Sequence, residues 1–309
     1  RQRQMCIRDS EIYGLTKIKH WFLQQMKELV DEENALIEKK GAVPAEPVLR
    51  QAKLDGFSDR YLSQILGVSE EDVRTTREKY GICEAWEGIH VSGTENAAYY
   101  YSTYHDIKDT SPVSDKPKIM ILGGGPNRIG QGIEFDYCCV HAALALKKLG
   151  FESIIVNCNP ETVSTDYDTS DKLYFEPLTL EDVLAIHAKE KPLGVIAQFG
   201  GQTPLNLAGD LKKYGVNILG TSPETIDLAE DRDHFRAMME KLGIPMPESG
   251  MAVNVDEALE IANRIGYPVM VRPSYVLGGR GMEIVHDDEM MKVYMSCLLY
   301  TSPSPRDRG

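Results

Sequence analysis

Two glycine-rich segments contain the residues of this sequence that could handle a charged ligand. The first is GGGPNRIGQG, residues 123–132, and the second is RPSYVLGGRG, residues 272–281. Glycine lets backbone N–H groups approach a phosphate without obstruction by Cβ, and Arg272 and Arg280 add positive charge to the second segment. Both segments therefore indicate anion binding. We expect the second to form a flap over a phosphate rather than an ordinary hairpin.

The first segment fits neither of the common nucleotide-binding motifs. A dinucleotide fingerprint would have its third glycine where Arg128 stands and an acidic residue where Asn157 ends the next apolar run. A Walker A loop would continue after Gly130 with Lys and Ser or Thr, but Gln131 and Gly132 follow. What remains is a turn between a strand and a helix, with exposed N–H groups that could hold a small anion or pass it along.

Two other segments follow apolar runs and could belong to the same site. FGGQTPLNLA, residues 199–208, contains Gln202 and Thr203, which either contact a ligand or only cap the next helix. NPETVSTD, residues 159–166, contains Glu161. In open α/β sheets, ligands bind beyond the carboxyl ends of the strands. Both segments are thus candidates for that edge.

The elements that must position these segments alternate between apolar runs and helix-like stretches. This alternation predicts a parallel sheet with helices on both faces. The expected strands are residues 118–122, 153–157, 194–198 and 216–219. Residues 267–272 and 282–285 are also expected strands, and their link is too short for a helical crossover, so we expect them to be antiparallel.

Residues 10–112 are predicted to be helical. Apolar residues recur there at spacings of three and four and predict one amphipathic helix with an apolar face: Ile18, Trp21, Phe22, Met26, Leu29 and Val30. The tyrosine cluster at 99–104 is expected to pack against a neighbouring domain rather than to bind a ligand. Residues 57–81 could alternatively form a DNA-binding helix-turn-helix, but its second helix would begin with Glu70, Glu71 and Asp72, which phosphates would repel.

Composition limits the class of protein further. The 309 residues carry 34 Lys and Arg against 47 Asp and Glu, a net charge of −13, which disfavours binding of nucleic acid or an anionic membrane over the whole surface. No apolar run is long enough for a transmembrane helix. The six cysteines form no CxxC pair, so we expect reduced thiols in a cytoplasmic protein. Residues 1–9 and 297–309 resemble translated sequencing adapters, and we expect both to be non-native tails.

Five long segments, in order, resemble the large subunit of carbamoyl-phosphate synthetases. They are residues 121–143, 157–179, 199–208, 220–235 and 271–285. The string PNRIGQGIEFDY resembles the second of that subunit's two homologous halves, which phosphorylates carbamate. The resemblance implies an α/β fold with an all-α N-terminal domain. Its domains would be a helical oligomerisation-like domain (10–112), a parallel-sheet pre-ATP-grasp domain (113–230) and the start of a truncated ATP-grasp domain (231–296).

The resemblance also implies an activity and roles for individual residues. The family's enzymes make carbamoyl phosphate from bicarbonate, glutamine-derived ammonia and ATP. Arg232 and Arg272 would contact ATP phosphates or substrate, and Ser274, Gly278 and Gly279 would form the flap. Carbamate would pass Arg128, Glu134 and Glu161. These roles match the charges, since arginines would meet anions and backbone N–H groups would meet phosphate.

The cofactors and partners implied are ATP, Mg²⁺ or Mn²⁺, K⁺, a small glutaminase subunit and further copies of the chain. The family's metal ligands and adenine-binding residues lie beyond the flap and beyond this sequence, so we expect no metal ligands here and an inactive fragment. The product would serve arginine and pyrimidine synthesis. Two alternatives are another ATP-grasp carboxylate ligase, such as a biotin carboxylase, and a non-catalytic interaction module.

Overall fold

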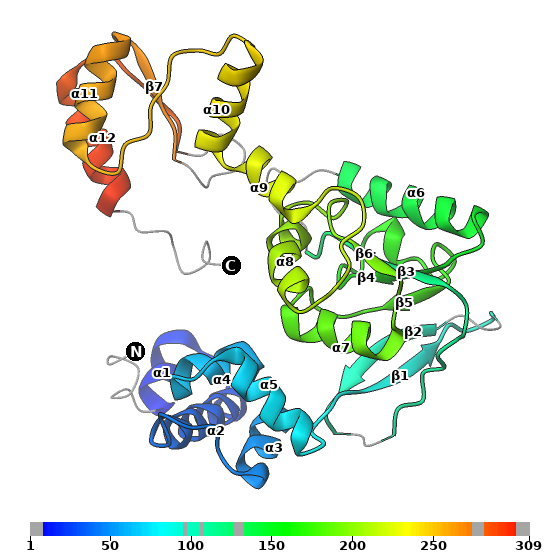
Figure 1. The fold of residues 1–309 in the computed structure, drawn as a ribbon. Helices are drawn as coiled ribbons and strands as arrows, with labels where there is room; N and C mark the ends of the chain where they lie inside the picture. Colours follow the sequence, from blue (N-terminus) through cyan, green and yellow to red (C-terminus); the bar gives the residue numbers. More distant parts are fainter. Residues whose placement is uncertain (1–8, 95–97, 106–107, 127–132, 274–280, 301–309) are drawn as a thin grey trace.

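The computed structural model describes residues 9–94, 98–105, 108–126, 133–273 and 281–300, which form three consecutive parts (Figure 1). A helical part is followed by a six-stranded sheet with its helices, and then by a smaller C-terminal unit. No helix of the described residues is long and apolar enough to cross a membrane.

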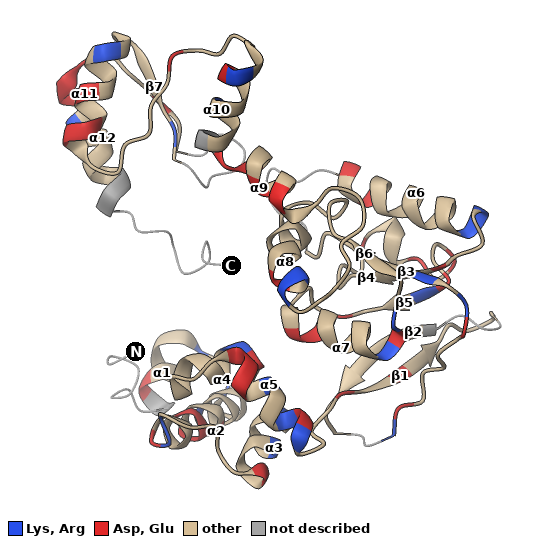
Figure 2. Ribbon diagram, in the orientation of Figure 1, with Lys and Arg blue, Asp and Glu red and all other residues tan. Residues whose placement is uncertain are grey.

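The helical part has its own apolar core. Its helices are α1 (Asp9–Thr16), α2 (His20–Ile37), α3 (Glu46–Leu54), α4 (Asp59–Leu66) and α5 (Glu70–Lys79). Leu49, Leu62 and Leu66 are fully buried in this core. Ser69 and Asp72 form a capping box at the start of α5. The first turn of α5 is acidic, and its ribbon is coloured red in Figure 2.

The apolar face predicted for residues 16–34 is present on α2 but is not covered. Trp21 is 66% exposed, Met26 58% and Phe22 54%, whereas only Leu23 and Leu36 of this helix are buried. Isolated exposed apolar residues are ordinary, but a continuous exposed face marks a contact surface. The face defined by Trp21, Phe22 and Met26 is called the α2 face below.

The central sheet has the order β1-β2-β5-β4-β3-β6. Its strands are β1 (Ala85–His90), β2 (Ala98–Thr103), β3 (Lys118–Leu122), β4 (Glu152–Val156), β5 (Lys172–Tyr174) and β6 (Gly194–Ile196). The four strands β3 to β6 are mutually parallel, which confirms the predicted parallel sheet, although β5 was not among the expected strands. The prediction of helix up to residue 112 is wrong beyond α5, because β1 and β2 form an antiparallel pair that extends the sheet through β5.

Helices cover both faces of the sheet, as the sequence predicts. Side chains alternate across a strand, so Ile119 and Ile121 of β3 face one side and Met120 and Leu122 the other. The first side packs against α6 (Glu134–Lys148). The second packs against α7 (Leu180–Glu190), α8 (Gln202–Lys213) and α9 (Pro223–Glu230). The strand expected at 216–219 is reduced to one bridge, between Val195 and Ile218.

Tyrosines of β2 attach the edge pair to the sheet. Tyr100 lies 5.6 Å from Tyr174 between ring centroids, and Tyr99 meets Phe175 edge to face. These tyrosines therefore pack as expected, but against β5 and Phe175 of their own sheet rather than against a neighbouring domain.

A buried ionic group fixes the amino-terminal edge of the sheet. Glu190, the last residue of α7, accepts from Lys118 at 2.7 Å and from Lys172 and Tyr174. Lys118 begins β3 and Lys172 begins β5, so one carboxylate ties two strands and a helix together. Although burial opposes ionisation, these donors hold the pKa of Glu190 below its usual value. The group lies at the edge opposite to the glycine-rich turns.

The C-terminal unit contains α10 (Arg232–Leu242), α11 (Val255–Ile265), β7 (Val269–Val271), β8 (Glu283–Val285) and α12 (Asp288–Tyr300). β7 and β8 pair antiparallel, which confirms the prediction from their short link. α12 extends to Tyr300 and so includes the first residues of the expected non-native tail. In Figure 1 this unit lies apart from the sheet and is joined to it through α9 and α10.

Candidate functional site

The glycine-rich turn after β3 is held by one buried side chain at the carboxyl edge of the sheet. Asn157 directly follows β4 and is 1% exposed. Its Oδ1 accepts from the backbone N–H of Gly125 at 3.0 Å and of Asn159 at 3.3 Å, and its Nδ2 donates to Ser164 at 3.0 Å. Asn157 therefore joins the turn after β3 to the loop after β4.

Close backbone packing explains two of the glycines in this region. A Cβ on Gly123 would lie 2.6 Å from Cγ of Asn157, and a Cβ on Gly200 would lie 2.2 Å from the carbonyl oxygen of Gly123. The turn after β3 and the turn after β6 therefore touch backbone to backbone. The sequence suggested glycines that make room for a ligand, but Gly123 and Gly200 make room for protein atoms.

The loop at 159–166 is fastened to the start of α6. The Asp136 carboxylate accepts from the backbone N–H of Ser164 at 3.1 Å, and Asn159 Oδ1 accepts from the N–H of Glu161 at 3.0 Å. Glu134 is the first residue of α6, and both Glu134 and Glu161 are exposed. The structure thus places these two predicted carboxylates on adjoining segments at one edge. Arg128, the third residue of the predicted carbamate path, lies outside the described residues.

The segment after β6 supplies polar groups to the same edge. Gln202 begins α8 and its Nε2 donates to Asn206 at 3.0 Å, while the N-cap of α8 is Gly201. Neither Gln202 nor Thr203 caps this helix, so the capping interpretation is wrong. Among the described residues, Oγ1 of Thr203 and Oε1 of Gln198 are buried and have no hydrogen-bond partner.

The predicted phosphate-binding residues belong to the C-terminal unit. Arg272 directly follows β7 and is exposed, and it forms no ion pair within the described part of the chain. Arg232 is the first residue of α10, but its side chain is not described. Ser274, Gly278 and Gly279 lie outside the described residues. The structure does not bring Arg272 to the carboxyl edge, since β7 lies beyond α9 and α10 from the sheet (Figure 1).

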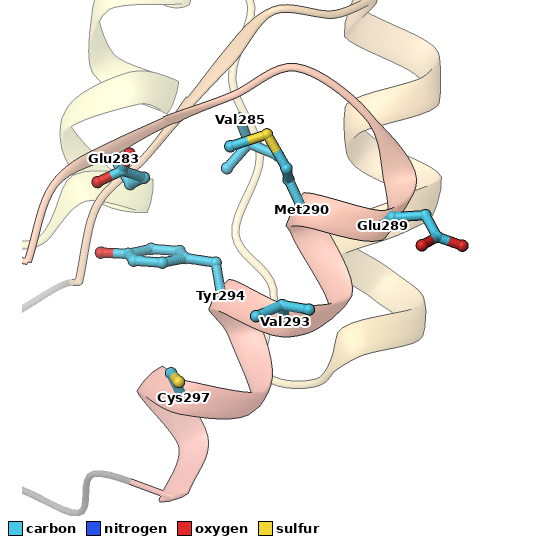
Figure 3. A pocket seen from close by; sticks show the side chains of 7 residues that line it. All are labelled: Glu283, Val285, Glu289, Met290, Val293, Tyr294 and Cys297. Atoms are coloured by element: carbon cyan, nitrogen blue, oxygen red, sulfur yellow. The ribbon is translucent and has the colours of Figure 1, made fainter.

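The C-terminal unit has an apolar hollow of about 390 Å³ between β8 and α12 (Figure 3). Figure 3 shows Met290, Val293 and Tyr294 lining it from α12 and Val285 from β8. Its side chains suit apolar contact rather than phosphate. In the described ranges, no group of three or more His, Cys, Asp or Glu could hold a metal ion.

Sequence reasoning overlooked Asn157, Asp136 and Gly200. In the sequence, Asn157 stands out only as a mismatch to the dinucleotide fingerprint. Its position directly after an apolar run was nevertheless a usable signal, because an amide there can bridge the turns of two neighbouring strands.

Three family models match consecutive parts of the chain. Residues 4–81 match the carbamoyl-phosphate synthetase large chain oligomerisation domain, and residues 115–228 match the carbamoyl phosphate synthase preATP-grasp domain. Residues 231–305 match the carbamoyl-phosphate synthase L chain ATP binding domain. The three matches follow the order of the three parts of the structure, and β1 and β2 lie between the first two matches.

Curated relatives agree with the family models. The carbamoyl phosphate synthase large chain of Archaeoglobus fulgidus is 53% identical over 301 residues, 95% of this chain and 28% of that protein. That of Xanthomonas axonopodis pv. citri is 55% identical over 289 residues, 93% of this chain and 27% of that protein. Among solved structures, the biotin carboxylase domain of Hydrogenobacter thermophilus 2-oxoglutarate carboxylase has a TM-score of 0.44 at 23% identity, over 58% of this chain and 39% of that one.

A parallel-sheet domain that precedes an ATP-binding domain defines an ATP-grasp type of architecture. The chain belongs to the carbamoyl phosphate synthase large-chain family. It spans about 28% of the length of the relatives it matches.

Proposed function

We propose that this chain is the part of a carbamoyl phosphate synthase large chain that delivers carbamate to its site of phosphorylation and begins the ATP-binding domain. The observation that carries the proposal is the order of three family matches on three structural parts. The reaction joins carbamate to the γ-phosphate of ATP and releases ADP, and bicarbonate and ammonia are the sources of carbamate.

The geometry supports distinct roles for the two ends of this segment. At the carboxyl edge of the sheet, Glu134 and Glu161 lie on segments that Asp136 and Asn159 hold in place. We assign these carboxylates to the path that carbamate takes, together with Arg128. In the C-terminal unit, the exposed guanidinium of Arg272 suits a phosphate oxygen, because arginine binds phosphate with a planar pair of N–H donors. Arg232, Ser274, Gly278 and Gly279 complete the proposed phosphate site.

Bound ATP would supply the phosphoryl group, and a divalent cation, Mg²⁺ by preference, would neutralise its charge. Residues of this chain would bind and orient the phosphates, and the metal ligands would come from elsewhere in a longer large chain. We accordingly expect residues 10–296 alone to show no ATP turnover with carbamate or bicarbonate. ATP turnover by residues 10–296 would contradict the assignment of the metal ligands to another part of the large chain.

The decisive experiment uses a longer gene product that contains this segment. Arg272→Ala is expected to lower kcat/KM for ATP in carbamoyl phosphate formation at least about tenfold. Arg272→Lys should lower it by a smaller factor, because lysine keeps the positive charge but lacks the paired N–H donors of a guanidinium. Arg264→Ala is the matched control, since Arg264 is an exposed arginine of the neighbouring helix α11. Equal activity of the Arg272 and Arg264 variants would overturn the phosphate assignment.

The α2 face also supports the proposal that the chain binds a partner. The helical part matches an oligomerisation domain, and Trp21, Phe22 and Met26 leave it with an uncovered apolar surface. We assign this face to contact with a second copy of the chain. A separate glutaminase subunit in the cytoplasm would be the source of ammonia. Trp21→Glu should abolish concentration-dependent association in sedimentation experiments, whereas unchanged association would place the contact elsewhere.

A further inference from the structure

A buried cluster of charged side chains joins the helical part to the central sheet. Its members come from both sides of the junction and from the segments that connect them: Lys53, Asp59, Arg77, Glu84, Tyr104 and Glu181. The side chains of the first three are at most 3% exposed. Charges so far from water need partners with good geometry, because an unpaired buried charge costs several kcal/mol.

Glu181, in the first turn of α7, is the member from the sheet side that holds the helical part directly. Its Oε1 lies 2.5 Å from Nζ of Lys53, which belongs to α3. Its Oε2 accepts from the backbone N–H of Asp59 at 2.7 Å. Asp59 is the first residue of α4, so the carboxylate also satisfies one of the N–H groups that every helix leaves unpaired at its start. One side chain of α7 thus contacts two helices of the other part.

The remaining contacts close the cluster around Asp59 and Glu84. Asp59 lies 3.0 Å from Lys53 and 2.7 Å from Nε of Arg77, which belongs to α5. Arg77 also lies 3.3 Å from Glu84. The Tyr104 hydroxyl lies 2.5 Å from Glu84 and 2.9 Å from Glu181. Four helices (α3, α4, α5 and α7), the segment before β1 and the segment after β2 therefore meet in one polar group.

The ionisation of the group is fixed by its own members. Burial disfavours a charge on Glu181, but Lys53 and Arg77 hold its pKa below the usual value, so the carboxylate is ionised. Burial and the neighbouring carboxylates raise the pKa of Tyr104, which keeps its hydroxyl proton available as a donor. The cations of Lys53 and Arg77 thus face the carboxylates of the cluster. The Tyr104 hydroxyl lies between two of these carboxylates, Glu84 and Glu181.

The residues just before Glu181 lie near the glycine-rich turn. Leu178 precedes Glu181 by three residues, and its Cδ1 would lie 3.6 Å from a Cβ on Gly125. The glycine-rich turn and the contact with the helical part are thus both close to one short segment. At the other end of the sheet domain, by contrast, no ion pair within the described ranges joins the C-terminal unit to the sheet.

We propose that Glu181 is an electrostatic clamp that makes the helical part and the central sheet one cooperative unit. The clamp is a conformational device: it fixes the orientation of a domain that is otherwise connected through β1, β2 and their flanking segments. The proposal does not depend on the proposed reaction. It concerns whether two parts of the fold can open separately.

Amide hydrogen exchange of the 309-residue chain, read by mass spectrometry, tests the clamp. In the wild type, the slowest amides of α3–α5 should exchange at the same rate as those of β3 and β4, because both require the same global opening. In Glu181→Gln, exchange in α3–α5 should accelerate by about two orders of magnitude while β3 and β4 keep their protection. Glu224→Gln, which removes an exposed partner of Lys212, should change neither region.

Three results would overturn the proposal. The first is a wild type in which α3–α5 already exchange much faster than the sheet. The second is a Glu181→Gln variant with unchanged protection, and the third is one in which both regions lose protection equally. If Glu181→Gln fails to fold, Tyr104→Phe removes only the bridging hydroxyl, and it should accelerate exchange in α3–α5 about tenfold while leaving β3 and β4 unchanged. Unchanged exchange in that variant would refute the clamp.

Discussion

Gly200 is the position where a single methyl group should damage the site most. In Gly200→Ala the new Cβ would lie 2.2 Å from the carbonyl oxygen and 2.5 Å from the carbonyl carbon of Gly123, and 2.6 Å from the carbonyl oxygen of Leu122. Carbon contacts are favourable at about 3.5 Å or more, so each overlap is close to 1 Å. All three atoms belong to the backbone. They cannot swing away as a side chain would.

Relief of the overlap would have to move the end of β3. That end is fixed on its other side, because Leu122 pairs with Val156 of β4 and the N–H of Gly123 donates to the carbonyl of Val156 at 2.9 Å. Overpacking of this kind costs about 3 kcal/mol or more when the neighbours cannot yield. For a domain of this size the unfolding midpoint should fall by roughly 6–12 °C.

Thermal unfolding followed by circular dichroism provides the assay, with Gly209→Ala as the matched control. Gly209 lies within α8, and a Cβ there would meet nothing within 4 Å. Alanine is favoured over glycine inside a helix by about 1 kcal/mol, so this variant should be slightly stabilised. A Gly200→Ala protein within about 0.5 kcal/mol of the wild type would show that the two turns are not packed as described.

Two further predictions concern the polar groups near this edge. Asn157→Ala should lower the free energy of unfolding in urea by about 2–4 kcal/mol, because two backbone N–H groups and Ser164 lose their partner. Asn206→Ala, at an exposed position, is the control and should lower it very little. Equal costs would contradict the bridging role. Burial, with Glu181 and Glu176 nearby, raises the pKa of Asp182 to about 7, so its folded form binds a proton more tightly than the unfolded chain does. The stability that this proton confers is complete only below about pH 4, where the unfolded chain is protonated too, and it is lost progressively as pH rises to about 7. Asp182→Asn should therefore raise the melting temperature by several degrees more at pH 8 than at pH 5, and equal shifts at both pH values would refute the assignment.

The sequence could predict β3, β4 and β6 because each lies in a continuous apolar run. It could not predict β5, which is three residues long and begins with a lysine. Residues 118–122 are buried on both faces, and this pattern has few other interpretations. β1 and β2 were missed for the opposite reason. They form an edge pair in which only some residues are buried, and the tyrosines of β2 were interpreted as packing residues within a helical region.

The candidate site could be predicted only as far as residue types and their place after a strand allow. Glu134 and Glu161 are indeed on adjoining segments, because parallel strands bring their carboxyl ends to one edge. The contact between Gly200 and Gly123 could not be predicted, since it depends on the approach of two backbones far apart in the chain. The clamp could not be predicted either, because its partners Lys53 and Glu181 are 128 residues apart in the sequence.

The ionic group around Glu190 has a consequence for how this domain can change in evolution. The charges that lock β3, β5 and α7 together lie at the amino edge, and the turns that face the proposed substrate lie at the carboxyl edge. Substitutions of exposed residues at the carboxyl edge, such as Glu134 or Glu161, leave that lock untouched. The sheet can thus keep its structure while the loops at its carboxyl edge change in sequence and chemistry. Its tolerance to new loops depends on residues that never meet a substrate.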